Sequence, residues 1–196
     1  LLSNWPLPNV WLGVSAEDQV RADERIPHLL KTPAAIRFVS AEPMLGPINF
    51  DAVPSKPNSK SRSLFGPLSG YCMRHFPRNN CGCKKQKPKI DWGICGGESG
   101  PNGRPMHPDW ARDLRDQCIN AGTPFFFKQW GEWGQDNFVN STAKDLWMST
   151  DGTLIDGGIL EIEQTDCVKP VSLVVRHGKK VAGRMLDGRE WNEVPT

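Results

Sequence analysis

The chain has 196 residues, of which 38% are hydrophobic and 23% charged, and its formal net charge is +2. This composition is ordinary for a folded soluble protein, either one domain or one domain with an appendage. No apolar stretch approaches the roughly 18 residues that span a membrane, and no signal-peptide pattern is present. Six cysteines without a secretory signal indicate a reducing, cytoplasmic setting. Because the chain opens inside an apparent βα connection, it is expected to be a fragment.

Four short apolar runs each lead into small or polar residues and a glutamate, at residues 10–17, 36–42, 92–98 and 125–132. Such runs predict strands buried on both faces of a parallel sheet, and helical patterns lie between them, so the predicted fold class is α/β. Ligands of α/β proteins bind at the carboxyl ends of the strands. The four glutamates are therefore expected to converge on one site. Alternatively, each glutamate caps the helix that follows it.

Residues 1–50 are predicted to form two βα units. The acidic residues at 18–24 suit a helix N-terminus. Proline lacks the amide hydrogen that a helix interior needs, so Pro27 predicts a break in this helix. A second helical segment is then expected, with Ile26 and Pro27 at its start and Lys31 at its end. The second strand ends at Glu42, and two following prolines predict a non-helical loop.

Residues 51–90 are predicted to be an insert between strands. They contain nine Lys or Arg and a single Asp, a local charge of +8, so the remainder of the chain sums to −6. A basic insert on an acidic body indicates contact with a polyanion such as nucleic acid. The alternative is a solvated loop.

A possible metal site lies in this insert, at Cys72, His75, Cys81 and Cys83. The spacing C-x2-H-x5-C-x-C supplies the four nitrogen and sulfur ligands of a closed tetrahedral zinc site. Zinc binding would provide folding energy that a polar insert lacks. The C-x-C pair is tighter than the usual C-x2-C hook, so unliganded reduced cysteines or a different cluster remain alternatives.

Residues 91–135 are predicted to hold the third and fourth strands with a helix between them. Gly96 and Gly97 follow the third strand, as in a loop that lets a ligand approach the backbone, although a tight turn is the alternative. Glu98, set among these glycines, could grip an amino or hydroxyl group. Pro108 and Asp109 predict a helix start, with His107 as its cap or as an acid or base. A stripe at i, i+4 and i+8 predicts core positions for Trp110, Leu114 and Cys118.

Lys128 ends the fourth apolar run. A lysine on a buried strand is costly unless an acid or a ligand pairs with it. The sequence therefore predicts either a salt bridge from Lys128 to Glu17, Glu42 or Glu98, or an anion-binding group.

The region from 136 to 196 is predicted to be a hairpin-rich tail, because turn dipeptides such as Asp151-Gly152 and Asp187-Gly188 recur in it. Its basic residues at 176–180 and 183–184 could meet phosphate or simply lie on the surface.

Five phrases, at residues 7–15, 37–43, 96–100, 126–131 and 182–191, closely resemble a phage-associated family of unknown function, the three-cysteine-motif proteins of phages and bacteria. The resemblance covers nearly the whole chain apart from 51–90. That family is similar to radical S-adenosylmethionine (SAM) enzymes, which implies that this chain holds the later strands of a partial TIM-like β/α barrel. The family's cysteine motif would precede Leu1. Cys72, Cys81 and Cys83 come too late in the chain to be the ligands of its iron–sulfur cluster.

The resemblance implies an enzyme of unknown reaction, with SAM and an iron–sulfur cluster as cofactors. SAM would be bound by Ser15, Glu17, Ser40, Gly96 and Gly97, and Glu42, Glu98 and Lys128 would carry the chemistry. Without the cluster, which supplies the electron, this chain alone is not expected to perform radical chemistry. The second hypothesis is a non-catalytic module that binds nucleic acid or a phage-host partner through the basic insert.

Overall fold

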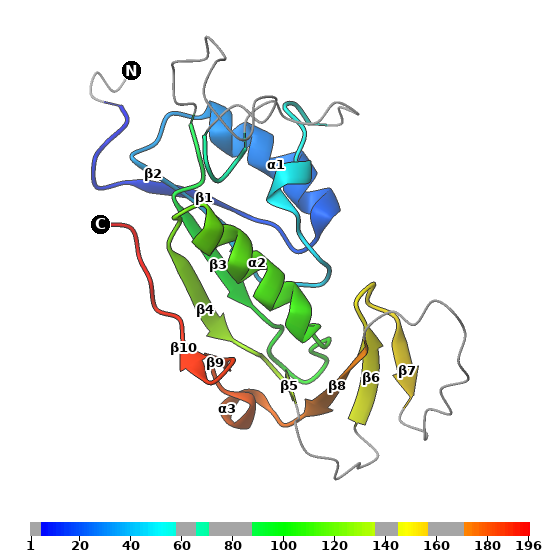
Figure 1. The fold of residues 1–196 in the computed structure, drawn as a ribbon. Helices are drawn as coiled ribbons and strands as arrows, with labels where there is room; N and C mark the ends of the chain where they lie inside the picture. The colour runs from blue at the N-terminus through cyan, green and yellow to red at the C-terminus, as the bar shows by residue number, and fades with distance from the viewer. Residues whose placement is uncertain (1–4, 58–65, 71–87, 136–144, 157–170) are drawn as a thin grey trace.

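The computed structural model describes residues 5–57, 66–70, 88–135, 145–156 and 171–196 (Figure 1). A parallel sheet contains, in spatial order, β1 (Trp11–Ser15), β2 (Ile36–Ala41), β3 (Trp92–Gly96) and β4 (Phe125–Gln129). The spatial order equals the order in the chain. Ser15 pairs with Ser40, and Ser40 with Ile94, so the carboxyl ends of the strands share one edge. The α/β prediction and its four strands are confirmed.

Helix α1 (Gln19–Lys31) follows β1 and begins at Asp18, whose carboxylate accepts the amide of Arg21 at 2.8 Å. The predicted break at Pro27 is wrong, because the helix runs through this residue. Ile26, Pro27 and Leu29 are buried together. Their burial against the sheet stabilises the helix more than one missing backbone hydrogen bond weakens it.

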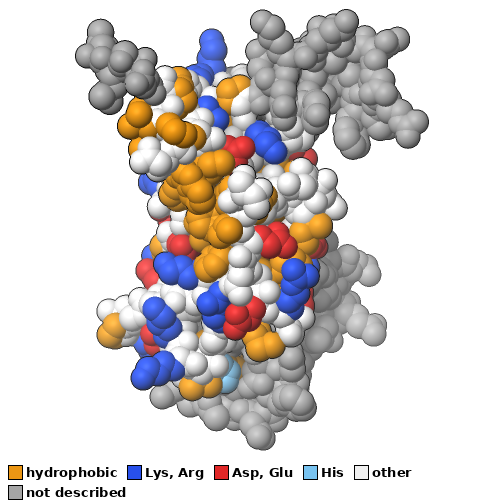
Figure 2. Space-filling model, turned by 90° about the vertical axis from the view of Figure 1, so that its left-hand side faces the viewer, with side chains coloured by type: hydrophobic (Ala, Val, Ile, Leu, Met, Phe, Trp, Pro, Cys, Tyr) orange, Lys and Arg blue, Asp and Glu red, His pale blue; other side chains and the backbone are white. Residues whose placement is uncertain are grey.

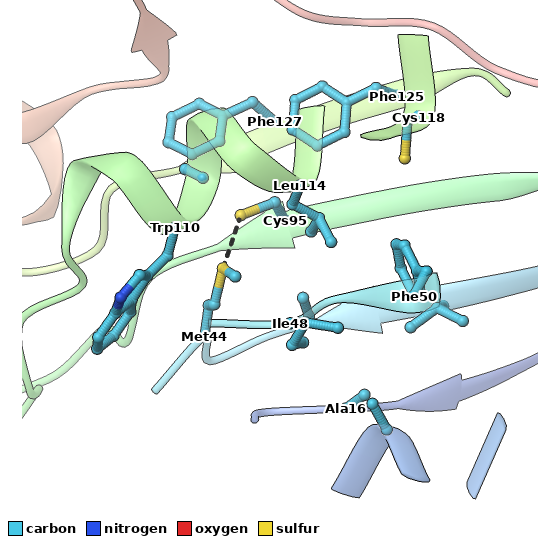
Figure 3. Close-up of a cluster of buried hydrophobic side chains, with 14 of the residues drawn as sticks. Ala16, Met44, Ile48, Phe50, Cys95, Trp110, Leu114, Cys118, Phe125 and Phe127 are labelled. Atoms are coloured by element: carbon cyan, nitrogen blue, oxygen red, sulfur yellow. Dashed lines mark hydrogen bonds between the residues drawn. The ribbon is translucent and has the colours of Figure 1, made fainter. Parts of the chain in front are cut away.

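Helix α2 (Pro108–Asn120) lies between β3 and β4 in the chain and packs on the same side of the sheet as α1 (Figure 1). Proline occupies its first turn, as predicted. The predicted stripe of Trp110, Leu114 and Cys118 is buried, which confirms Cys118 as a core residue. These side chains meet Phe125 and Phe127 of β4 in the main core (Figure 3).

The opposite face of the sheet is not buried as predicted. Along β1, Trp11, Gly13 and Ser15 are exposed, whereas the residues between them are partly buried. The expectation of strands buried on both faces is therefore wrong for β1. Its physical reason is that α1 and α2 cover one face of the sheet and no described helix covers the other.

Described parts of the insert belong to the core of this body. The 3-10 helix η1 (Phe50–Ala52) buries Phe50, and Val53, Leu68 and Ile90 are also buried. The predicted zinc ligands at 72, 75, 81 and 83 lie outside the described residues.

Short antiparallel strands follow β4 in the chain, and the first of them begins before residue 136, where the tail was expected to start. One sheet holds β5 (Trp133–Gln135), β8 (Val171–Arg176), β6 (Asp145–Ser149) and β7 (Leu154–Asp156), in that spatial order. The short helix α3 (Lys179–Ala182) leads to the hairpin of β9 (Met185–Leu186) and β10 (Arg189–Glu190). Within the described part of the chain, no helix is long and apolar enough to cross a membrane.

The end of the tail returns to the parallel sheet. Trp191 and Glu193 lie along the outer edge of β4, where Phe127 donates its amide to the Trp191 carbonyl at 2.9 Å. The Glu193 amide donates to the Phe125 carbonyl at 3.2 Å. The edge of β4 is therefore covered by residues that follow it in the chain by more than sixty positions.

Candidate functional site

A charged pair joins two strands at the carboxyl edge of the parallel sheet. Lys128 Nζ lies 3.2 Å from Glu42 Oε1, although β3 separates their strands. The second oxygen, Oε2, accepts a hydrogen bond from the Ser40 hydroxyl at 3.0 Å. The predicted salt bridge of Lys128 thus forms with Glu42. Both side chains reach solvent, with exposed fractions of 54% for Lys128 and 18% for Glu42.

Gly96 makes this bridge across β3 possible. A β-carbon at position 96 would lie 2.5 Å from Glu42 Oε1, so the carboxylate occupies the space that any other side chain would need. At Gly97, a β-carbon would lie 1.8 Å from the carbonyl oxygen of Trp130. Both glycines therefore serve close packing within the protein, and both are buried. Their predicted contact with a cofactor remains a prediction.

The other predicted acids have separate partners. Arg25 NH1 lies 3.1 Å from Glu17 Oε1, and it also donates to the Ser15 carbonyl at 3.0 Å. Arg104 binds Glu98 through two side-chain hydrogen bonds of 2.7 and 2.9 Å. These bonds from Arg104, together with its backbone amide, lower the pKa of Glu98 and keep it ionised. Of the three predicted glutamates, Glu42 is thus the one whose ion pair connects the ends of two different strands.

None of these glutamates caps the helix that follows it. Asp18 caps α1, and His107 caps α2 by accepting the Asp109 amide on Nδ1 at 3.1 Å. Glu132 instead accepts the Gly100 amide at 3.0 Å and so holds the loop after β3. The capping alternative for the glutamates is therefore wrong, whereas capping by His107 is confirmed.

A second polar contact at this edge was not predicted. Gln129 donates its side-chain amide to the Ser99 hydroxyl at 2.7 Å and so ties the end of β4 to the loop after β3. Both residues stand beside predicted site residues in the chain, Lys128 and Glu98. Their position next to these two residues was the sequence feature that could have indicated a role at the site. The sequence could not show that the side chains of Gln129 and Ser99 are in contact.

Aromatic side chains cover the open face below this edge. Trp92 is in edge-to-face contact with Trp11, Phe38 and Phe126, at ring-centroid distances of 5.8, 5.9 and 6.0 Å. The guanidinium of Arg184 lies 5.5 Å from the centre of the Phe126 ring. Seen from this side of the molecule, hydrophobic side chains form a contiguous patch with charged residues below it (Figure 2). Side chains on the open face are thus aromatic in the middle of the sheet and charged near the carboxyl ends of the strands.

The described thiols are poor metal ligands. Burial raises the pKa of Cys95 well above its usual value, with a smaller effect of the Glu42 carboxylate. Burial also raises the pKa of Cys118 to about 12. Both side chains are fully buried among apolar core residues, so neither is placed to hold an iron–sulfur cluster. The described residues also contain no group of three His, Cys, Asp or Glu side chains placed to hold a metal ion.

The fold is α/β, and polar side chains gather at the carboxyl ends of its parallel strands, the place where ligands of α/β proteins bind. The family described as "Protein of unknown function (DUF5131)" matches residues 1–195, and the chain belongs to this uncharacterised family. Searches of curated proteins and of solved structures returned no match.

Proposed function

We propose that this chain supplies the carboxyl edge of β1–β4 to the ligand pocket of a radical-SAM-like enzyme. On this proposal the sheet is the later part of a partial TIM-like barrel. Three features support it: the strands are parallel, they follow one another in chain order, and both long helices pack on one face. In a β/α barrel the helices lie outside, and the inner face carries rows of side chains from neighbouring strands. The open aromatic face corresponds to that inner face.

The Glu42–Lys128 pair is the observation that carries the proposal. A carboxylate and an ammonium 3.2 Å apart, both reaching solvent, offer complementary charges to a ligand that has an amino and a carboxyl group. Glu42 would hold the ligand's ammonium, oriented by Ser40, and Lys128 would hold its carboxylate. SAM has both groups on its methionine part, so this donor set fits SAM.

SAM would supply a carbon radical only when an iron–sulfur cluster donates an electron to it. The described thiols do not fit that cluster, since Cys95 and Cys118 are fully buried in the core and no described group of side chains is placed to hold a metal ion. On this basis the chain binds and orients the ligand.

Calorimetric titration of the chain with SAM tests the proposal. We expect saturable binding that Glu42→Gln and Lys128→Met each weaken roughly tenfold or more, because each variant removes a charge-assisted contact. Glu24→Gln is the matched control, since Glu24 forms an exposed ion pair with Arg21 within α1. A folded wild-type chain that shows no saturable binding contradicts the proposal, and so does an equal loss in the control.

The charge of the insert favours a second candidate function, binding of nucleic acid by residues 51–90, with zinc held by Cys72, His75, Cys81 and Cys83. Nine basic residues against one acidic residue are the observation behind it. Binding of an oligonucleotide should then fall steeply with salt and disappear when the lysines and arginines of the insert are replaced by glutamine, which leaves the buried Val53, Leu68 and Ile90 in place. Zinc analysis should give about one equivalent, lost when the cysteines are replaced by serine. Unchanged oligonucleotide binding after these replacements excludes this function.

A further inference from the structure

The loop that follows β3, residues 98–103, is held in place by residues that come after β4 in the chain. The Gly100 amide donates to a carboxylate oxygen of Glu132 at 3.0 Å, and the Glu132 amide donates to a carbonyl of the loop at 2.8 Å. Trp133 of β5 and Arg176 of β8 each donate a side-chain hydrogen bond to a further carbonyl of this loop. The loop is therefore fixed from outside, as the supporting residues of a binding site would require.

An extra residue in β4 brings Gln129 to the open face of the sheet. Gly96 pairs with Gln129, whereas Cys95 beside it pairs with the residue two positions before Gln129, so Lys128 is an extra residue in this strand. Side chains alternate along a strand, and paired residues of neighbouring strands point to the same face. Gln129 therefore shares the open face with Gly96 and Trp92. Such an extra residue re-aims side chains and is frequent beside functional sites.

The contact between Ser99 and Gln129 leaves one hydrogen-bond donor and one acceptor free. Gln129 Nε2 donates to Ser99 Oγ at 2.7 Å, so the Ser99 hydroxyl keeps its own hydrogen for another acceptor. Among the described residues, none accepts that hydrogen and none donates to Gln129 Oε1. Ser99 is exposed and Gln129 is half-buried, so a ligand can reach both groups. The pair thus offers a donor and an acceptor side by side, next to Lys128.

We infer that Ser99 and Gln129 bind the vicinal diol of a ribose, building on the proposed function, in which Lys128 holds the carboxylate of SAM. One hydroxyl of the diol accepts the Ser99 hydrogen, and its neighbour donates to Gln129 Oε1. Lys128 and Gln129 are consecutive residues, with α-carbons about 3.8 Å apart. Because a short flexible chain joins the ribose of SAM to its amino-acid part, one SAM molecule can meet both contacts.

Calorimetric titration with SAM and with L-methionine tests this contact, because L-methionine lacks the ribose. Ser99→Ala and Gln129→Met should each weaken SAM binding roughly fivefold or more and so lower the ratio of SAM affinity to L-methionine affinity. Lys128→Met should weaken both ligands. Ser55→Ala, at an exposed serine outside the loop, is the control and should change neither affinity. Equal weakening of both ligands by Ser99→Ala and Gln129→Met overturns the inference, as does unchanged SAM binding.

Titration with adenosine and with dideoxyadenosine, which lacks both ribose hydroxyls, tests the diol without the amino-acid part of SAM. The wild-type chain should bind adenosine roughly tenfold more tightly than dideoxyadenosine, and Gln129→Met should abolish this preference. Equal binding of the two nucleosides, or binding of neither, overturns the inference even where SAM binds. A preference for adenosine in a chain that does not bind SAM supports the diol contact and contradicts the proposed function alone.

Discussion

The carboxylate of Glu42 occupies the position that a side chain at Gly96 would take, 2.5 Å from the place of its β-carbon. Because Gly96 of β3 has no side chain, Glu42, the residue directly after β2, can reach across β3 to Lys128 on β4. Three consecutive strands are coupled by this arrangement, although the middle one contributes no side chain.

Gly96→Ala should destabilise the protein by about 1 kcal/mol or less, because the methyl group displaces the end of the flexible Glu42 side chain and breaks its solvent-exposed ion pair with Lys128. Urea unfolding measures the change in the free energy of unfolding. In a Glu42→Ala background the same substitution should cost less, since the space is then free. Equal costs in the two backgrounds would show that the clash lies elsewhere.

His107 should make the protein sensitive to mild acid. Burial lowers the pKa of His107 despite the nearby Asp109 carboxylate, so the folded state favours neutral imidazole. A group whose folded pKa lies below its unfolded value, about 6.5 for histidine, stabilises the fold above that value. That contribution declines as the pH falls from about 6.5 toward the lower folded pKa. Measured between pH 8 and 5, the unfolding free energy should fall in the wild type.

His107→Asn is the matched variant for this pH dependence, because asparagine is a good helix cap and does not titrate in this range. Its unfolding free energy is expected to be lower than wild type at pH 8, since it leaves unfilled the volume of a fully buried imidazole. The difference between wild type and variant should shrink toward pH 5. A difference that is constant with pH contradicts the assignment.

Cys95 and Cys118 should resist alkylation in the folded protein. Burial raises the pKa of both thiols, and only the thiolate reacts. Treatment with iodoacetamide at pH 8, followed by peptide mass spectrometry, should leave both residues unmodified until denaturant is added. Rapid labelling of either thiol at native conditions would show that the core opens there.

Asp187→Asn should destabilise the protein by roughly 1 kcal/mol and less at high salt. Asp187 lies in the turn of the β9–β10 hairpin at a positive φ of 54°, which asparagine also tolerates. Its carboxylate accepts hydrogen bonds from Arg112 at 2.9 Å and from Arg115 at 2.6 Å. Asp116→Asn is the control, because Asp116 is a more exposed neighbour of Arg115 and its loss should have little effect. Equal effects of both substitutions in thermal unfolding would contradict this ranking.

Local patterns in the sequence predicted most of the fold. The four apolar runs became the four strands, and the Pro108 start with its i, i+4, i+8 stripe became α2. The break at Pro27 was wrong because a local rule about proline cannot weigh the burial of the surrounding helix face. Burial on both sheet faces was wrong for a related reason, since an apolar run does not show which layers are present to cover it.

The sequence predicted that charged side chains lie at the carboxyl ends of the strands, but it did not predict which of them pair. Lys128 and an acid were expected to pair, and three acids were equal candidates. Lys128 pairs with Glu42 because Gly96, on the strand between them, leaves space for the Glu42 side chain. This arrangement involves three strands that are far apart in the sequence, so no local sequence pattern could predict it. The partners of Glu17 and Glu98 are arginines eight and six residues further along the chain. Their pairing depends on how the loop and helix after each strand turn back.

The pairing of the tail with β4 has a consequence for synthesis. The Trp92 indole donates to the carbonyl of Glu193, a residue 101 positions later in the chain. While the chain is being made, β4 therefore emerges long before the residues that cover it, and its outer edge is exposed in the meantime. Non-local contacts of this kind form late and leave unpaired strands open to aggregation. The outer edge of β4 is thus closed only after more than sixty further residues have been made.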